Sequence, residues 1–382
     1  MKRILLPILI ALITFILLTD ESKKKTLKTE ESKVITISFV GDLMCHEPQY
    51  EFARRGNDSF NFRPTFSEVK KIFSSSDYVI GNLETVVKGT GTKLGSYPFF
   101  NSPIEFLDAI KDAGFNILIT SNNHCLDQGI NGLEKMISNL DKFGFNHLGT
   151  YKDLQDRDSI RIFNKQGIHL AVLSYTYGVN GNFILPRKKF AVNLIDTSLI
   201  RKDIFSARKK NADVVIVYFH FGEEYERFPN KFQREIVELT KNFGADIIIA
   251  SHPHVIQPLE FFVPKSGKLD RGFVAYSLGN FISNQRWRYS DCGVILNFSL
   301  EKMNENKIVL DTISIIPTWV FKGNTGNQNS FVIIPSDTSY FKNFPDYITN
   351  NDKEKILQSF NDTKRTLAEV LSFKRKAYLH SN

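Results

Sequence analysis

The chain has 382 residues, of which 42% are hydrophobic and 24% are charged, an ordinary composition for a globular protein with a large core. The formal net charge is +8 at pH 7, but the basic residues are scattered rather than gathered in one stripe, which argues against a nucleic-acid-binding protein. Three cysteines are too few, and odd in number, for a disulfide framework.

The first 19 residues predict a signal peptide or a signal anchor. Lys2 and Arg3 precede an apolar run of about 15 residues, which suits a secretory signal better than a membrane span of ~20 residues. No small-residue cleavage site follows, so an uncleaved anchor is favoured; a cleaved signal and a buried core helix are the alternatives. Residues 20–33 are polar and are expected to form a tether. The rest of the chain would then be extracytoplasmic, either anchored to the cytoplasmic membrane or secreted.

From residue 34 the sequence alternates between apolar strands and helices. Residues 35–39 alternate between apolar and polar side chains and predict a strand that ends at Gly41-Asp42. Nearly continuous apolar strands are expected at 78–81, 115–120, 170–175, 214–219 and 246–250. Helices are expected after Pro103 to about 114, and over 129–143, 198–210 and 231–243. Because such strands separated by helices indicate a buried, largely parallel sheet, the pattern predicts an α/β fold.

The pattern changes beyond residue 270. Segments 273–276, 294–298 and 308–316 alternate more regularly and predict antiparallel strands. Residues 324–330 predict a polar loop, and residues 353–373 predict a helix. We therefore place one domain over residues 34–322 and a partly helical C-terminal extension over residues 323–382, for which the sequence suggests no role.

Side chains that can bind metal ions stand directly after five predicted strands. They are Asp42, Glu84, Asn123 with His124, His220, and His252 with His254. In open α/β sheets ligands bind at the carboxyl ends of the strands, so these side chains should share one edge. Carboxylates, a carboxamide and imidazoles suit Zn, Mn or Fe. Single histidines are usually ordinary core or surface residues, but the convergence of several strand ends favours a metal site.

Three of the candidate positions have a second interpretation. His46, four residues after Asp42, either binds a metal or caps the next helix. Glu84 follows a buried strand, where an unpaired carboxylate is costly, so it is a metal ligand or the partner of a cation, and the first is favoured. Asp127 either orients the imidazole of His124 or caps the following helix.

Six short motifs in chain order resemble those of the CapA family, whose members are linked to capsular poly-γ-glutamate synthesis and are related to calcineurin-like metallophosphoesterases. They are Gly41-Asp42-Leu43-Met44, Asn82-Leu83-Glu84, Asn122-Asn123-His124 with Asp127 and Gly129, His220-Phe221-Gly222 with Glu224-Tyr225, Ser251-His252-Pro253-His254 and Ser277-Leu278-Gly279-Asn280-Phe281. The match runs from about Val34 to Phe298. Each motif alone is a weak signal, whereas the ordered set is specific.

The resemblance implies a sandwich of two central mixed sheets flanked by helices, in four layers, with two divalent metal ions at one edge. It implies that Asp42 and His254 bind one ion, with His46 as a further ligand, and that Asn123, His220 and His252 bind the other. Glu84 stands where the phosphoesterases place a bridging aspartate, and His124 would protonate the leaving group. This chain differs from the phosphoesterase pattern in two ways: it has Glu84 in place of that aspartate, and its histidine stands four rather than two residues after Asp42. These differences leave the identity and number of the ions open.

The predicted chemistry is metal-dependent hydrolysis of a phosphoester or an amide bond. Two cations ~3.5–4 Å apart lower the pKa of a bridging water, and a histidine is suited to donate the proton. Candidate catalytic residues are His124 and Asp127; candidate substrate-binding residues are Glu224, Tyr225, Asn280 and Arg286. Arg286 belongs to a basic and aromatic cluster with Trp287 and Arg288. The alternative interpretation of this cluster is a solvated surface without a role in binding.

We therefore expect a membrane-tethered extracytoplasmic hydrolase involved in synthesis, processing or attachment of capsular poly-γ-glutamate or a similar anionic surface polymer. The alternative is a non-catalytic polymer-binding or assembly partner of a membrane synthase or exporter. The expected partners are the anionic cell-surface polymer, synthase or exporter subunits, and the membrane through the N-terminal segment, but no nucleic acid.

Overall fold

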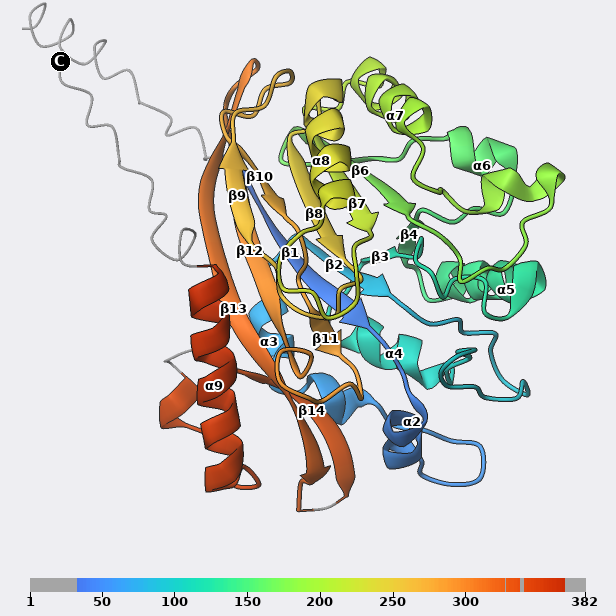
Figure 1. Ribbon diagram of the computed structural model, residues 1–382, viewed down its shortest axis with the longest axis vertical. Coiled ribbons are helices and arrows are strands. Elements are labelled where there is room, and N and C mark those ends of the chain that lie inside the picture. Colours follow the sequence, from blue (N-terminus) through green and yellow to red (C-terminus); the bar gives the residue numbers. More distant parts are fainter. Residues whose placement is uncertain (1–32, 327, 337–339, 368–382) are drawn as a thin grey trace, which may run out of the picture. The chain divides into compact units, whose positions relative to one another are not determined.

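The computed structural model describes residues 33–326, 328–336 and 340–367 (Figure 1). The predicted signal segment, residues 20–32 of the predicted tether, and residues 368–373 of the predicted C-terminal helix lie outside these ranges. Within the described part of the chain, no helix combines the length and the apolar character needed to cross a membrane.

The first sheet has eight strands and is mixed. Its order is β14-β13-β12-β1-β2-β3-β4, and β11 pairs with the end of β1. The parallel half contains β1 (Lys33–Leu43), β2 (Tyr78–Leu83), β3 (Ile117–Ile119), β4 (Asn146–Leu148) and β11 (Asn280–Ile282). The antiparallel half contains β12 (Cys292–Asn304), β13 (Lys307–Asn324) and β14 (Asn329–Pro335).

The second sheet has six strands in the order β5-β6-β7-β8-β10-β9. Its four central strands are parallel: β6 (Ile168–Thr176), β7 (Val214–His220), β8 (Ile247–Ser251) and β10 (Gly272–Ala275). The edge strands are antiparallel to their neighbours: β5 (Ile162–Lys165) and β9 (Leu259–Phe262).

The two sheets pack face to face, and helices cover their outer faces, so the fold has four layers (Figure 1). Alternate residues of one strand serve different layers. In β7, Val214, Ile216 and Tyr218 enter the core between the sheets, whereas Val215 and Val217 pack under the outer helices. This alternation explains why the strands are apolar without interruption, since both faces of each sheet are buried.

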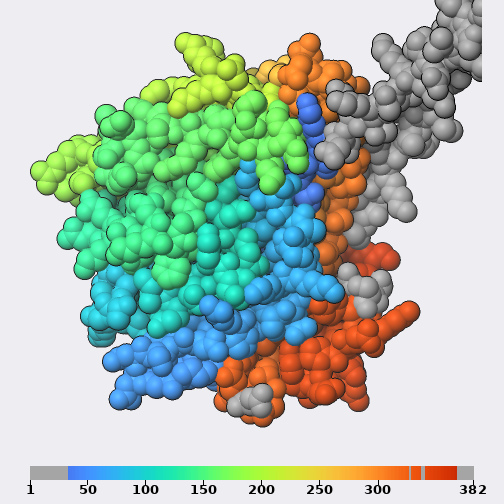
Figure 2. Space-filling view, turned by 180° about the vertical axis from the view of Figure 1, so that it is seen from behind, coloured from blue at the N-terminus to red at the C-terminus, as the bar shows by residue number. Residues whose placement is uncertain are grey.

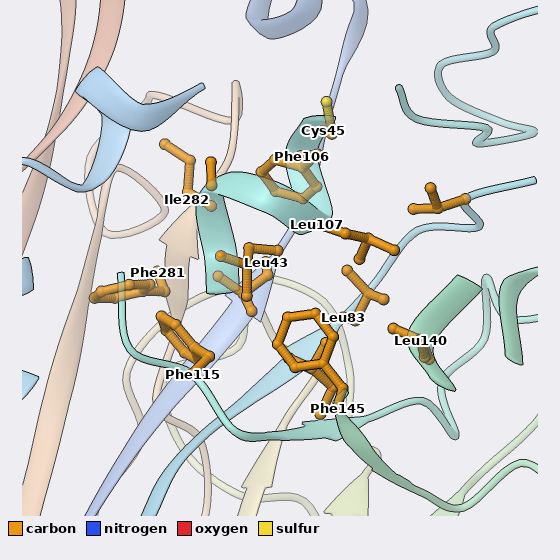
Figure 3. Close-up of a cluster of buried hydrophobic side chains, with 14 of the residues drawn as sticks. Leu43, Cys45, Leu83, Phe106, Leu107, Phe115, Leu140, Phe145, Phe281 and Ile282 are labelled. Carbon is orange, nitrogen blue, oxygen red and sulfur yellow. The ribbon is translucent and has the colours of Figure 1, made fainter. Parts of the chain in front are cut away.

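The helices of the first outer layer are α2 (Glu47–Ala53), α3 (Lys70–Phe73), α4 (Glu105–Asp112) and α5 (Gly129–Lys142). Figure 3 shows part of the core beneath this layer, where Phe106 and Leu107 of α4 lie near Leu43 of β1 and Leu83 of β2. Short 3-10 helices at Arg63–Phe66, Pro186–Ala191 and Tyr340–Lys342 complete the connections.

The second outer layer contains α7 (Thr197–Lys209) and α8 (Lys231–Phe243), and α6 (Leu154–Asp158) precedes β5. The sequence sets the ends of α8. At its start, the Asn230 side chain accepts a hydrogen bond from the backbone N–H of Gln233, and the Gln233 side chain accepts one from the backbone N–H of Asn230. At its end, Gly244 terminates the helix with a φ of 103°.

The C-terminal part adds to the first sheet. Strand β14 pairs along β13, and α9 (Asn350–Thr366) packs on these strands through Ile356 and Trp319. Seen from behind, the orange and red C-terminal residues lie along one side and the blue-to-green N-terminal half along the other (Figure 2). Strand β14 and its turn lie beyond residue 322, where we placed the domain end; that boundary stays a prediction.

Two expectations about strands need correction. Residues 273–276 were expected to be antiparallel, but β10 is parallel to β8 and antiparallel only to β9. The segment 308–316 is antiparallel as expected, but its strand continues to Asn324. The first difference arises because a buried apolar strand has the same alternation whichever way its neighbours run.

Candidate metal centre

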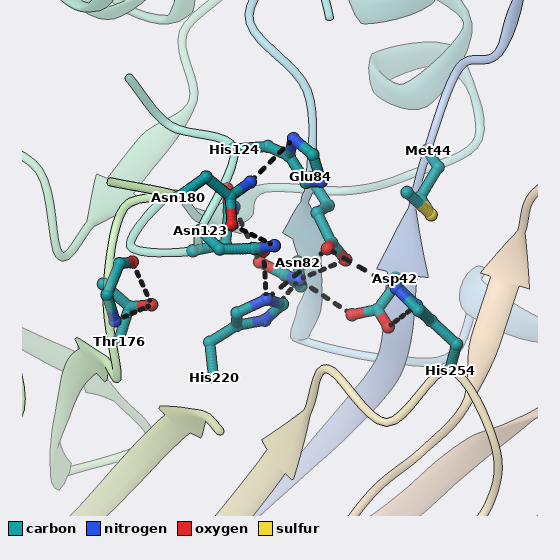
Figure 4. A network of polar contacts seen from close by, with 12 residues as sticks. Asp42, Met44, Asn82, Glu84, Asn123, His124, Thr176, Asn180, His220 and His254 are labelled. Carbon is teal, nitrogen blue, oxygen red and sulfur yellow. Dashed lines mark hydrogen bonds and ion pairs between the residues drawn. The ribbon is translucent and has the colours of Figure 1, made fainter. Parts of the chain in front are cut away.

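The carboxyl ends of the parallel strands of both sheets meet at one edge (Figure 4). Register places Asp42 of β1 beside Asn82 of β2, and His220 of β7 beside Ser251 of β8. All of these residues are buried. The strand-end residues singled out from the sequence are therefore brought to neighbouring positions by strands of two different sheets.

Two glycines allow the strands to approach closely at this edge. A Cβ atom on Gly41 would lie 1.8 Å from the carbonyl oxygen of Gly279, so no other residue fits without displacing the backbone. The adjacent Asp42 N–H donates to that same oxygen at 3.1 Å. This contact joins two sequence motifs that are far apart in the chain.

Asn82 organises the carboxylates of the first sheet. Its Nδ2 lies 2.8 Å from Oδ1 of Asp42, 3.4 Å from Oε2 of Glu84 and 3.2 Å from Nδ1 of His220. Its own Oδ1 accepts from Nδ2 of Asn122 at 3.1 Å. Asn82 therefore fixes the orientation of residues from both sheets.

Glu84 is fully buried, and its Oε1 has no hydrogen-bond partner among the residues that the structure describes. That oxygen lies 3.4 Å from Nε2 of His220 and 3.9 Å from Nε2 of His254. Burial, together with the charge of Asp42, raises the pKa of the Glu84 carboxyl well above its usual value. A buried carboxylate oxygen that faces two imidazoles and has no donor is a fitting ligand for a cation.

Two imidazoles of the second sheet, those of His220 and His252, have lowered pKa values, which favours their neutral form. Burial lowers the pKa of His220 to about 3, and burial with the neighbouring histidines lowers the pKa of His252 well below its usual value. Nδ1 of His252 is buried and has no hydrogen-bond partner within the described part of the chain. A neutral imidazole with a free nitrogen is the form that binds metal ions.

The backbone that carries the second pair of histidines is strained. His252 has a φ of 108° and His254 a φ of 57°, which side-chain-bearing residues rarely adopt. Such conformations persist where surrounding structure holds them, and they concentrate at functional sites. The conformation turns both imidazoles of the motif towards the same cluster, with ring centroids 5.9 Å apart.

Asp42 and His254 contact each other directly. Nδ1 of His254 lies 3.1 Å from Oδ2 of Asp42 and 3.1 Å from Oδ1 of Asn280. Burial alone would raise the pKa of Asp42, but the hydrogen bond and charge of His254 bring it below the usual value. Asn280 thus touches a candidate ligand, and its amide nitrogen is bound to Gln285 and to the Ser290 carbonyl.

Three groups of side chains offer metal-ligand atoms that all lie within 4.8 Å of one another. They are Asp42, Glu84 and His254; Glu84, His220 and His252; and Glu224, His252 and His254. The first two groups share Glu84 and form neighbouring sites with one carboxylate in common. Asn123 adjoins the second, because its Oδ1 lies 2.8 Å from Nε2 of His220. These oxygen and nitrogen donors fit first-row divalent ions.

His124 and Asp127 form a pair beside these groups. Nδ1 of His124 donates to Oδ2 of Asp127 at 2.7 Å, and the N–H of Phe100 donates to the same oxygen at 2.8 Å. Asp127 does not cap α5, whose N-cap is Gln128. The contact therefore matches the orienting role and leaves Nε2 of His124 free; the predicted catalytic role of the pair stays a prediction.

A cleft of about 410 Å³ opens beside the candidate ligands. Its lining comprises Met44, His46, Tyr97, His124, Glu224, Tyr225, His254, Asn284, Gln285 and Trp287. His46 lies in this wall and belongs to none of the three ligand groups; its Nδ1 contacts Gln49 and the Asn284 N–H instead. His46 is also the N-cap residue of α2.

The predicted substrate-binding residues have different surroundings. Glu224 and Tyr225 line the cleft. Arg286 does not, because its guanidinium donates to the Val320 carbonyl at 3.1 and 3.2 Å and lies over Trp319. Its predicted contact with substrate stays a prediction, and its neighbour Trp287 is the member of that cluster that reaches the cleft.

The loop after β6 contributes two residues that sequence reasoning missed. The ring of Tyr177 lies 4.6 Å from that of His252, and Oδ1 of Asn180 accepts from Nδ2 of Asn123 at 3.2 Å. That bond orients Oδ1 of Asn123 towards His220. The segment 170–175 was expected to be a strand, so the rule that ligands bind at strand ends could have pointed to this loop.

Comparisons with known proteins agree with the motif pattern. The family model described as bacterial capsule synthesis protein PGA_cap matches residues 36–285. The chain is 30% identical to the PGA biosynthesis protein CapA of Bacillus subtilis, over 82% of this chain and 80% of that protein. It is 28% identical to the capsule biosynthesis protein CapA of Bacillus anthracis, over 75% of this chain and 69% of that protein.

Among solved structures, the chain is similar to the calcineurin-like phosphoesterase YfkN from Bacillus subtilis. The TM-score is 0.44 and the sequence identity is 13%, over 91% of this chain and 100% of that one.

Proposed function

The chain belongs to the bacterial capsule synthesis protein PGA_cap family, and from this premise we propose that it is a metal-dependent phosphoester hydrolase. It acts outside the cytoplasm, tethered by its N-terminal segment, in the assembly of capsular poly-γ-glutamate or a similar anionic surface polymer. Its partners are that polymer and the membrane subunits that make or export it.

The observation that carries the proposal is the position of Glu84. Its unpartnered, fully buried oxygen belongs to two ligand groups at once, one completed by Asp42 and His254 and the other by His220 and His252. A charged carboxylate in this position is balanced when cations share it.

Two divalent cations held by these groups would polarise a phosphoryl oxygen and supply a water of lowered pKa, which suits displacement at phosphorus. The chain's own residues do the rest. Asn82 holds Asp42 and Glu84 in place, and Asn180 fixes the carboxamide of Asn123. His124, oriented by Asp127 through Nδ1, presents Nε2 to the cleft and donates a proton to the departing oxygen.

Metal content and turnover test the proposal together. The full-length chain is stripped with a chelator, reloaded separately with Mn, Zn or Fe, and assayed on bis(p-nitrophenyl) phosphate. We expect Glu84→Gln to lose metal and turnover together, since an amide cannot share its charge between two ions. Glu235→Gln on the exposed face of α8 is the matched control and should behave like the unaltered protein.

His124→Asn separates chemistry from metal binding. We expect it to retain its metal and to lose about a hundredfold or more in turnover, because a positioned proton donor contributes about 10²–10⁴. Full metal loading without turnover of any phosphoester would contradict the hydrolase and favour a non-catalytic assembly partner. For the location, protease added to intact spheroplasts should digest the domain; full protection would contradict an extracytoplasmic site.

A further inference from the structure

The cleft beside the ligand groups contains no fixed positive charge. None of its lining residues within the described part of the chain is a lysine or arginine, and Glu224 adds a carboxylate. The nearby Arg286 is directed to the Val320 carbonyl, and Arg288 is paired with Asp362 of α9. Lys322 contacts Asn284 of the wall but is not itself a lining residue. An anionic chain laid along this cleft would therefore meet no lysine or arginine among the described lining residues to balance its repeated carboxylates.

Exposed aromatic rings surround the same cleft. Tyr97 is 70% exposed, Trp287 52% and Tyr225 39%, and all three line it. The rings of Tyr225 and Trp287 meet at 62° with their centroids 5.2 Å apart, which forms a corner with two apolar faces. Tyr225 lies 6.1 Å from the ring of His254, and Tyr97 lies 6.4 Å from that of His124. The corner therefore adjoins the ligand groups, and Tyr97 adjoins the predicted proton donor.

Planar polar side chains complete the walls. The amide of Gln285 donates to the Tyr225 hydroxyl at 3.1 Å, and Asn284 accepts from Lys322 at 3.1 Å. Both amides and the Glu224 carboxylate line the cleft. Aromatic faces suit the apolar C–H faces of a ring, and amides and carboxylates suit its hydroxyl groups. This combination matches an uncharged sugar ring.

We propose that the cleft binds a neutral sugar ring against Tyr225 and Trp287, so that the substrate is a sugar phosphoester. This inference rests on the proposed function for the reaction, whereas the sugar-binding surface itself does not depend on turnover. Hydrolysis breaks the P–O bond, and water supplies the hydroxyl that stays on phosphorus and the proton that ends on the sugar oxygen. The single anionic group of the substrate faces the metal ligands, and its uncharged part lies in the cleft.

Binding is tested first, on the full-length, metal-loaded chain. The probe is tri-N-acetylchitotriose, a neutral trisaccharide, followed by tryptophan fluorescence. The chain has two tryptophans, and Trp319 is fully buried, so a change on binding reports Trp287. We expect saturable quenching that a γ-glutamyl oligomer does not reverse. Calorimetry then measures variants, and Trp287→Ala and Tyr225→Ala should each weaken binding about tenfold.

Phe205→Ala is the matched control, since Phe205 is a 61% exposed aromatic on α7 and does not line the cleft. Its affinity for the trisaccharide should equal that of the unaltered chain. Trp287→Phe should retain most of the affinity, because it keeps an aromatic face. The inference is overturned by absent trisaccharide binding, by preferential binding of the γ-glutamyl oligomer, or by equal effects of Phe205→Ala and Trp287→Ala.

Turnover is tested second, with N-acetylglucosamine 1-phosphate, glycerol 3-phosphate and adenosine monophosphate. We expect the sugar phosphate to have a KM about tenfold below that of the glycerol ester, and Trp287→Ala to remove this difference through KM. Equal KM values, or a preference for the nucleotide, would overturn the sugar assignment while leaving the hydrolase intact. Sugar binding without turnover would instead remove the proposed function alone.

Discussion

The two sheets contribute different chemistry to the shared edge. Two ligand groups share Glu84, and Asn123 adjoins one of them. The first sheet supplies their oxygen donors, whereas the second sheet supplies only the imidazoles of His220, His252 and His254. Neither sheet alone supplies all the donors of either of these two groups, although Glu224, His252 and His254 of the third group all follow strands of the second sheet. The metal centre therefore depends on the packing of the sheets against each other, and the core between them determines its geometry.

The two halves are also held in different ways. The oxygen donors of the first sheet are fixed by side-chain hydrogen bonds, above all those of Asn82. The His252–His254 pair of the second sheet is placed by a strained backbone with positive φ. Burial drives Glu84 and His220 towards their uncharged forms, since it raises the pKa of Glu84 and lowers that of His220. A bound cation would reverse this balance by favouring the carboxylate while keeping the imidazoles neutral.

The largest expected effect comes from removing one donor from each half in turn. Asp42→Asn should remove the ion shared with His254, and His220→Asn the ion shared with His252, so each variant retains about one ion per chain instead of about two. Turnover should fall by more than about a hundredfold, because direct ligands matter more than their supporting residues. Elemental analysis beside kinetics checks this. Loss of both ions in both variants would show that the halves are not separable.

Asn82→Ala should weaken metal binding without removing a ligand. We expect about a tenfold to hundredfold loss of affinity, since Asn82 orients Asp42 and Glu84. Asn139→Ala is the control, because Asn139 is also buried but donates to the Val87 carbonyl. Both variants should lose stability, and only Asn82→Ala should alter metal titrations. Equal metal affinity in the two variants would contradict a role for Asn82 at the site.

Glu84 and His220 should affect the pH dependence of stability in opposite directions in the chelator-treated protein. The pKa of His220 is about 3 when folded and 6.5 when unfolded, so the unfolded chain binds more protons between these values. Stability present above pH 6.5 is therefore lost as the pH falls towards 3. Glu84, with a raised pKa, has the opposite sign: its contribution is present below pH 4.5 and is lost as the pH rises.

Denaturant titrations at several pH values check the histidine half. His220 alone should lower the free energy of unfolding by about 1–2 kcal/mol between pH 6.5 and pH 5. His220→Asn should make the profile less steep over this range, and Glu84→Gln should not. Some slope should remain, because burial also lowers the pKa values of His46 and His252. An unchanged profile in His220→Asn would mean that its ring is charged in the folded chain.

The smallest expected effect is at Asn180, in the loop that follows β6. Asn180→Ala removes the hydrogen bond that orients Asn123. It also removes the contact between the Asn180 amide and Nδ1 of His124. We expect a loss of about threefold to tenfold in kcat/KM, in line with one hydrogen bond, at unchanged metal content. Asn182→Ala in the same loop, which removes only a bond to the Val179 carbonyl, should have no effect on turnover.

Much of the framework could be predicted from local pattern. The strand and helix segments from residue 35 to residue 250 and the polar residues after each strand follow from apolar alternation, because every parallel strand is buried on both faces. The shared ligand groups fit that pattern, since parallel strands end at one edge and bring together Asp42, Glu84, His220, His252 and His254. The edge strands β4, β5, β9 and β14 were missed. Strands β4, β5 and β9 are only three or four residues long, too short for a clear alternation, whereas β14 contains the apolar run 331–334 and could have been predicted.

The sequence alone thus determined which residues stand at strand ends, while the tertiary structure decided where each side chain points. Only packing shows that His46 lies in the cleft wall outside the ligand groups, and that Arg286 binds a backbone carbonyl while Trp287 faces the cleft. Only the packing of two sheets places carboxylates from one beside imidazoles from the other. The physical reason is that alternation is a local property of the chain, whereas the partner of a buried polar group is set by residues distant in sequence.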